Sequence, residues 1–163
     1  MSWVERGATL IELVITIVII SVAIAGVVGA FSVITGRSAD PLNQTRAVEL
    51  AQLYMDEILT KKYDESAHQG GVPRVPGNCT SGPEGAETRA TFNDVDDYHG
   101  LSGVPASHTN TALAGYEGFK VSVTVACAGA EVGLPHTEAK RIDLDISAPG
   151  NQSFTFSAYR VNF

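Results

Sequence analysis

The residues best suited to chemistry form an acidic cluster near the middle of the chain. Asp94, Asp96 and Asp97 follow Asn93 and precede Gly100, so several oxygen ligands stand at alternating and adjacent positions. Oxygen ligands of this kind can wrap around Ca²⁺, although the segment lacks the length and the terminal Glu of an EF-hand loop. The alternative is a solvated turn in which Asp side chains accept hydrogen bonds from the local backbone. Both interpretations stay open, and such turns are the commoner of the two.

The sequence carries no motif typical of an enzyme. Its four histidines fall in expected loops without the i, i+4 spacing of a zinc-binding helix. They are His68, His99, His108 and His136. No Walker loop or dinucleotide fingerprint occurs, and the string 100–103 (GLSG) is too short for a nucleophile elbow. We therefore expect a protein that is not an enzyme and has no resident cofactor, apart from the calcium considered above.

A single carboxylate, Glu12, stands at the edge of the longest apolar segment. From Leu13 to Ile34 the chain has neither a charge nor a proline. At about 1.5 Å per residue, a helix of this length crosses a hydrocarbon core of about 30 Å. An acid within such a helix costs about 2.5–3.5 kcal/mol at the bilayer centre and less near an end, so it requires a partner. Glu12 is therefore expected to be functional.

The string ERGATLIEL at residues 5–13 resembles the class III signal of type IV prepilins. The resemblance implies that a prepilin peptidase cuts after Gly7 and methylates the new terminus at Ala8. It also implies that Glu12 acts in filament assembly. The chain departs from the family pattern in three ways. It has Ala8 where Phe is usual, it has no net positive leader, and no proline interrupts the apolar run.

Elementary electrostatics gives this assembly role a physical basis. Cleavage would leave a cationic amine at Ala8, close to the anionic Glu12 on a helix without other charges. Each charge is costly alone and complementary when paired, so the amine of an incoming subunit could meet Glu12 of a neighbour and fix the register. Small residues within the run permit close helix packing. They are Thr16, Ser21, Ala23, Ala25, Gly26, Gly29 and Ala30.

Two simpler interpretations of the N-terminus compete with this one. The tripeptide 23–25 (AIA) matches the cleavage pattern of a conventional signal peptide, but the apolar stretch continues well beyond it. A plain membrane anchor accounts for the apolar run and leaves Glu12 unexplained.

The chain beyond the apolar run predicts one helix followed by strands. Apolar residues recur with helical spacing over 41–63, which indicates an amphipathic helix lying on a sheet. Alternating segments predict strands at 88–92, 119–127, 140–148 and 153–161. Segments rich in Gly, Pro and Ser predict loops at 66–87 and 93–115.

The expected class is therefore α+β. In this class, a long N-terminal hydrophobic helix continues into an amphipathic helix packed on a C-terminal antiparallel β-sheet. The resemblance to type IV prepilins implies the same arrangement, which is the pilin fold. The expected organisation is a leader peptide at 1–7, a transmembrane or filament-core helix at 8–36, and an extracytoplasmic head at 37–163 with its sheet over about 88–163.

The two cysteines, Cys79 and Cys127, both follow the apolar run. An even pair in an exported segment predicts a disulfide, which would tie a loop to the sheet.

Two further strings resemble the minor, D-type prepilin-like proteins of mannose-sensitive haemagglutinin (MSHA) pili. They are AVELAQLYMDEIL at 47–59 and NDVDDYHG at 93–100. The resemblance implies a structural minor pilin that crosses the bacterial inner membrane once, with its head in the periplasm, and later joins an extracellular pilus. Its implied partners are other pilin subunits, the prepilin peptidase, the inner-membrane assembly machinery and, before assembly, the lipid bilayer.

Two alternative functions remain. One is a type II secretion pseudopilin, which has the same kind of N-terminal segment. A membrane-anchored periplasmic enzyme or binding domain would share only the anchor, and Glu12 would then be dispensable.

The charge balance argues against general nucleic-acid binding. The net charge is −7, and 16 acidic residues against 10 basic ones lie in 37–163. A protein that binds phosphate backbones by counterion release needs a basic surface instead.

Overall fold

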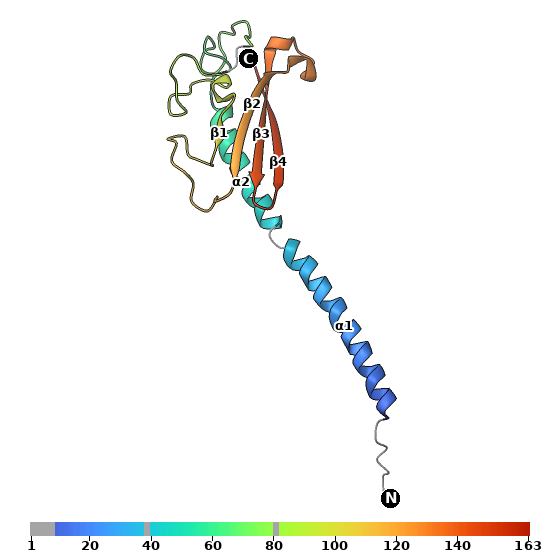
Figure 1. The fold of residues 1–163 in the computed structure, drawn as a ribbon. Helices are drawn as coiled ribbons and strands as arrows, with labels where there is room; N and C mark the ends of the chain where they lie inside the picture. The colour runs from blue at the N-terminus through green and yellow to red at the C-terminus, as the bar shows by residue number, and fades with distance from the viewer. Residues whose placement is uncertain (1–8, 38–39, 80–81) are drawn as a thin grey trace, which may run out of the picture. The chain divides into compact units, whose positions relative to one another are not determined.

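The computed structural model describes residues 9–37, 40–79 and 82–163. It confirms the α+β class, with an apolar N-terminal helix, a second helix and a four-stranded antiparallel sheet (Figure 1). The elements are α1 (Leu10–Arg37), α2 (Asp40–Leu59), β1 (Ser102–Gly103), β2 (Lys120–Cys127), β3 (Ala139–Ala148) and β4 (Gln152–Val161). Three short 3₁₀ helices are η1 (Asp96–Tyr98), η2 (Gly129–Val132) and η3 (His136–Glu138). The chain divides into two compact units, Met1–Leu42 and Asn43–Phe163.

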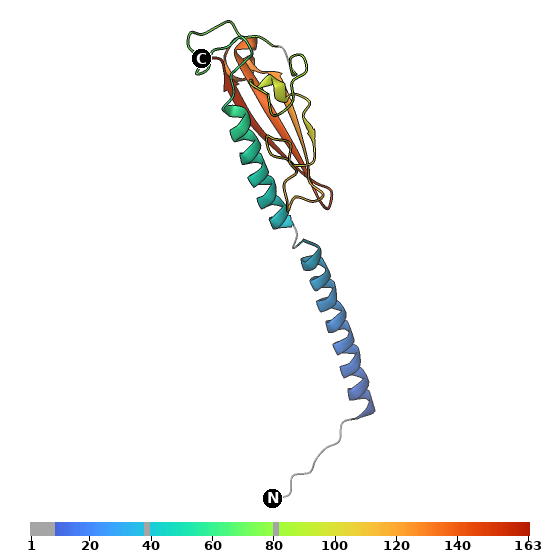
Figure 2. The same ribbon diagram turned by 90° about the vertical axis from the view of Figure 1, so that its left-hand side faces the viewer.

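The second unit is built on the amphipathic face of α2. Ala47, Leu50, Ala51, Tyr54 and Ile58 recur at helical spacing, and each is at least 95% buried. They share one core with the inward side chains of the sheet. Figures 1 and 2 show α2 lying along the sheet on one side of it.

The helix α2 ends at Leu59, four residues before the predicted boundary at position 63. The chain leaves the helix because its backbone pairs elsewhere. Lys62 N donates to Asn93 O at 3.3 Å, and Lys62 O accepts from Val95 N at 3.1 Å. This contact joins two segments about thirty residues apart in sequence, so a local helical pattern does not reveal it.

The sheet has the order β1-β2-β3-β4, and all its neighbouring strands are antiparallel. Strict alternation places one set of side chains in the core. On β2 and β3 this set is Val121, Val123, Val125, Ile142, Leu144 and Ile146. The opposite face is polar, with Ser157 Oγ donating to Asp143 and Thr155 Oγ1 donating to Asp145. One face of the sheet is therefore available to α2, and the other is compatible with water.

The hairpin between β3 and β4 is anchored to α2. Gly150 and Asn151 have φ values of 81° and 60°, which glycine and asparagine tolerate better than other residues. Asn43 Nδ2 donates to Pro149 O at 3.1 Å and to Gln152 Oε1 at 2.9 Å. The first turns of α2 are thus fixed to the turn of the hairpin.

The predicted strand at 88–92 is wrong. Thr91 N and Phe92 N both donate to Thr88 O, and the Thr91 hydroxyl also bonds Thr88 O, which closes a turn. Arg89 then reaches the core side and pairs with Glu57 at 2.7 Å. The first strand is the two-residue β1, which lies within the predicted loop at 93–115.

Candidate functional site

The helix α1 presents apolar side chains to the outside around its whole circumference. From Leu10 to Phe31 its large apolar side chains are 51–83% exposed. Leu10–Ser32 is the one helical segment of the described chain that is long and apolar enough to cross a membrane, and none of it is buried. A core helix of a soluble protein is buried instead, so this surface needs lipid or protein to cover it.

Glu12 lies in the first turn of α1 and is exposed. Glu12 N donates to Thr9 Oγ1 at 3.4 Å, and Leu13 N donates to Thr9 O at 3.2 Å. Thr9 therefore occupies the N-cap and Glu12 the third helical position, the spacing of a capping box. The positive end of the helix dipole also favours a carboxylate there. Among the described residues Glu12 forms no ion pair, so its charge is free to meet a partner. The predicted cleavage residues, Gly7 and Ala8, lie outside the described residues.

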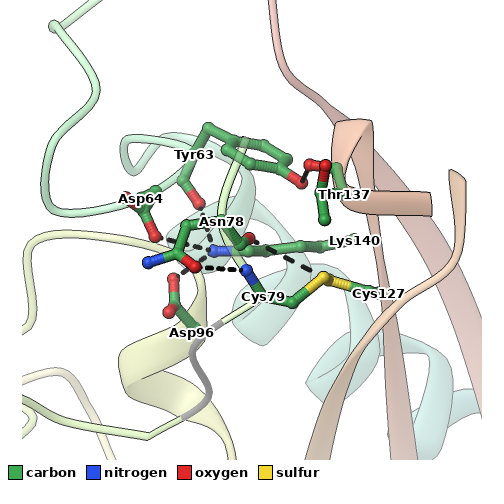
Figure 3. Close-up of a disulfide and its surroundings, with 8 residues drawn as sticks. All are labelled: Tyr63, Asp64, Asn78, Cys79, Asp96, Cys127, Thr137 and Lys140. Carbon is green, nitrogen blue, oxygen red and sulfur yellow. Dashed lines mark hydrogen bonds and ion pairs between the residues drawn. A yellow bond between two sulfur atoms is a disulfide. The ribbon is translucent and has the colours of Figure 1, made fainter. Parts of the chain in front are cut away.

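Cys79 and Cys127 form a disulfide with a Cα–Cα distance of 5.8 Å (Figure 3). The bridge joins the long loop after α2 to the end of β2, as the sequence predicts. Cys127 is also the cross-strand neighbour of Lys140 on β3. His136 lies near both sulfur atoms, but sulfurs joined in a disulfide are not thiolates and do not bind a metal.

The three aspartates predicted to bind calcium or form a solvated turn lie together around η1. They are buried, with Asp94 and Asp96 0% exposed and Asp97 1% exposed. The prediction that this turn is exposed to solvent is therefore wrong. The predicted local backbone bonding is present. Asp97 Oδ2 accepts from Asn93 N and Asp94 N, while Asp94 Oδ1 accepts from Asp96 N and Asp97 N. The turn holds these carboxylates inside the protein.

Asp96 has a buried cation beside it. Lys140 Nζ lies 2.5 Å from Asp96 Oδ1, 3.5 Å from Asp64 Oδ1 and 2.8 Å from Tyr63 O (Figure 3). Lys140 is 1% exposed and stands at the inward position of β3 that precedes Ile142. It thereby joins the segment that follows α2, η1 and the sheet.

The surroundings shift the pKa values of two carboxyls in opposite directions. Burial raises the pKa of Asp64, but hydrogen bonds from Ser66 and the charge of Lys140 outweigh it, so this pKa lies below its usual value. Burial and the neighbouring carboxyls of Asp96 and Asp97 raise the pKa of Asp94 to about 8. Lys140 thus stabilises the negative charge of Asp64, while Asp94 is crowded by other acids.

Sequence patterns missed Lys140, Glu84 and Glu87. Lys140 has the same strand parity as Ile142 and Leu144, so its place in the alternation was a usable signal. Glu84 and Glu87 lie near Asp97 in space, but their loop has no periodicity that would indicate this.

No protein-family model, curated protein or solved structure matches the chain.

Proposed function

We propose that this chain is a structural minor pilin of a type IV, MSHA-like pilus, and not an enzyme. In this proposal a prepilin peptidase cuts after Gly7, and α1 then holds the subunit in the bacterial inner membrane with its head in the periplasm. The assembly machinery later transfers α1 from lipid to the core of an extracellular filament made with other pilin subunits. The resemblance of residues 5–13 to a class III signal supports this order of events.

The observation that carries the proposal is the lone carboxylate on α1. From Leu10 to Phe31 the large apolar side chains of α1 are exposed on every side, which suits lipid before assembly and other helices afterwards. An anchor needs only that surface, and a signal sequence near an N-terminus can have it too. Glu12 adds a charge that a lipid-facing helix does not need. A neighbouring subunit's amine would give that charge a partner.

The capping-box position of Glu12 makes a sharper test possible than simple removal. Glu12→Gln keeps the length of the side chain and a residue accepted in a capping box, but it removes the charge. Glu12→Val removes both. Thr16→Val is the matched control, because it keeps the small β-branched shape that close helix packing needs and removes only an uncharged hydroxyl, which donates to Glu12 O inside the same helix at 2.7 Å.

The measurement is the ratio of the subunit in sheared filaments to that in membranes. We expect Glu12→Gln and Glu12→Val to lower this ratio at least about tenfold, and Thr16→Val to leave it near wild type. Cleavage and membrane levels should be unchanged in all three. If Glu12→Gln assembles like wild type, Glu12 acts as a cap and charge pairing is not its role.

A further inference from the structure

Two glutamates extend the group of aspartates around η1 into a larger carboxylate cluster next to Lys140. Glu84, Glu87 and Asp97 place one oxygen each within 4.8 Å of one another, and so do Glu84, Asp94 and Asp96. Two oxygens bound to one calcium ion at about 2.4 Å cannot be farther apart than this. The spacing within each group is therefore compatible with one cation, and Glu84 belongs to both groups.

Several oxygens in this cluster are buried and unsatisfied. Among the described residues, Asp94 Oδ2, Asp97 Oδ1, Glu87 Oε2 and Asn93 Oδ1 have no hydrogen-bond partner. The other oxygens of Asp94 and Asp97 accept backbone N–H groups, which fixes the direction of both side chains. Buried carboxylate oxygens are costly without a donor or a cation. This is the feature that a simple Asp-rich turn does not explain.

The buried carboxyls of the cluster also outnumber the cationic side chains beside them. Four aspartates, Asp64, Asp94, Asp96 and Asp97, are buried beside one ammonium, that of Lys140. In the described part of the chain, Asp94 and Asp97 form no ion pair with Lys or Arg. Glu84 and Glu87 add two more carboxyls beside Asp97.

We propose that Glu84, Glu87, Asp94 and Asp97 form a calcium site in the head, with Asp96 shared between this site and Lys140. All the ligands are oxygens, which suit a hard cation and disfavour zinc. They come from an irregular loop and a short 3₁₀ helix, and Ca²⁺ accepts such irregular geometry more readily than Mg²⁺. Glu84 is exposed and lies at the solvent side of the cluster. The bound ion would fasten the loop at 84–87 to η1, and this does not depend on the assembly proposal.

The test is calcium binding by the full chain in detergent micelles, measured by calorimetry after removal of metal with a chelator. We expect one calcium ion per chain, weaker binding of magnesium, and a higher melting temperature with calcium than with chelator. Glu84→Gln should weaken binding about tenfold or more, because affinity follows the number of charged ligands. Asp56→Asn is the matched control, since Asp56 is exposed on α2 and lies outside both groups.

No binding at millimolar calcium, or equal melting temperatures with calcium and chelator, would mean that these carboxyls share protons and not a metal. Equal affinity for magnesium would overturn the choice of ion. Unchanged binding in Glu84→Gln would overturn the location. Asp97→Asn should abolish calcium binding. If that variant fails to fold, Glu84→Gln still tests the location of the site, because Glu84 is exposed.

Discussion

Lys140 connects three parts of the head at a single atom. Its ammonium contacts the backbone at Tyr63 and the carboxylates of Asp64 and Asp96, which lie 76 and 44 residues away in sequence. It also lies 4.6 Å from the centre of the Tyr63 ring. Because all these groups are buried, each depends on the others for its charge balance.

Replacing Lys140 should therefore destabilise the head strongly. Lys140→Met keeps an unbranched apolar side chain one atom shorter than that of Lys, but it leaves two buried carboxylates without their cation. We expect a loss of about 3–5 kcal/mol in the free energy of unfolding, measured by denaturation of the full chain in micelles. Lys120→Met is the control, because Lys120 is exposed at the start of β2. Equal stability of the two variants would show that Lys140 contributes little as a cation.

At the scale of elements, the core depends on one face of α2. Leu50 is 1% exposed and belongs to the core shared with the sheet, whereas Leu53 is 41% exposed on the same helix. The two leucines have the same propensity, so they differ only in what they contact.

This difference gives a matched pair of substitutions. Leu50→Ala should cost about 2–5 kcal/mol because it removes buried methyl groups and leaves a cavity. Leu53→Ala should cost about 0.5 kcal/mol or less. Unfolding followed by circular dichroism measures both. A similar loss in the two variants would contradict the packing of α2 on the sheet.

The disulfide is the second constraint on the elements of the head. Cys79 and Cys127 are 48 residues apart, and the chain-entropy model assigns closure of such a loop roughly 4 kcal/mol. Reduction should lower the melting temperature of the full chain. The double variant Cys79→Ala/Cys127→Ala should have a melting temperature near that of the reduced protein, and reductant should not change it. Two alkylatable thiols in the unreduced folded chain would refute the bridge.

At the scale of the whole molecule, the chain combines two units with different requirements. The unit Asn43–Phe163 contains its own core, and α1 in the other unit exposes its large apolar side chains from Leu10 to Phe31. A conventional signal peptide would be removed, whereas an assembly helix must remain attached to the head.

The N-terminus of the mature protein distinguishes these fates. Cleavage after Gly7 leaves α1 intact, so we expect the mature chain to begin at a methylated Ala8. Intact mass and N-terminal sequencing of the membrane-bound protein measure this. A start at Gly26 would identify a conventional signal peptide, and the filament proposal would then be wrong.

Local patterns in the sequence were enough to predict much of this protein. The apolar run of α1 with Glu12 at its edge is a continuous signal, whereas the amphipathic face of α2 and the alternation of β2, β3 and β4 are periodic signals. Each reflects which surface of one element is apolar, and neighbouring residues alone determine that. The cysteine pairing also followed, because the chain has only two cysteines.

Tertiary structure decided what happens where distant segments meet. It ended α2 at Leu59 through backbone pairing with the segment at 93–95, and it turned 88–92 back on itself so that Arg89 could reach Glu57. It also buried Lys140 beside Asp96 and brought Glu84 to Asp97. The burial of a charge depends on partners far away in sequence, because only a specific opposite charge or cation offsets its desolvation. No local pattern records such a partner, so the composition of the carboxylate cluster emerged only from the fold.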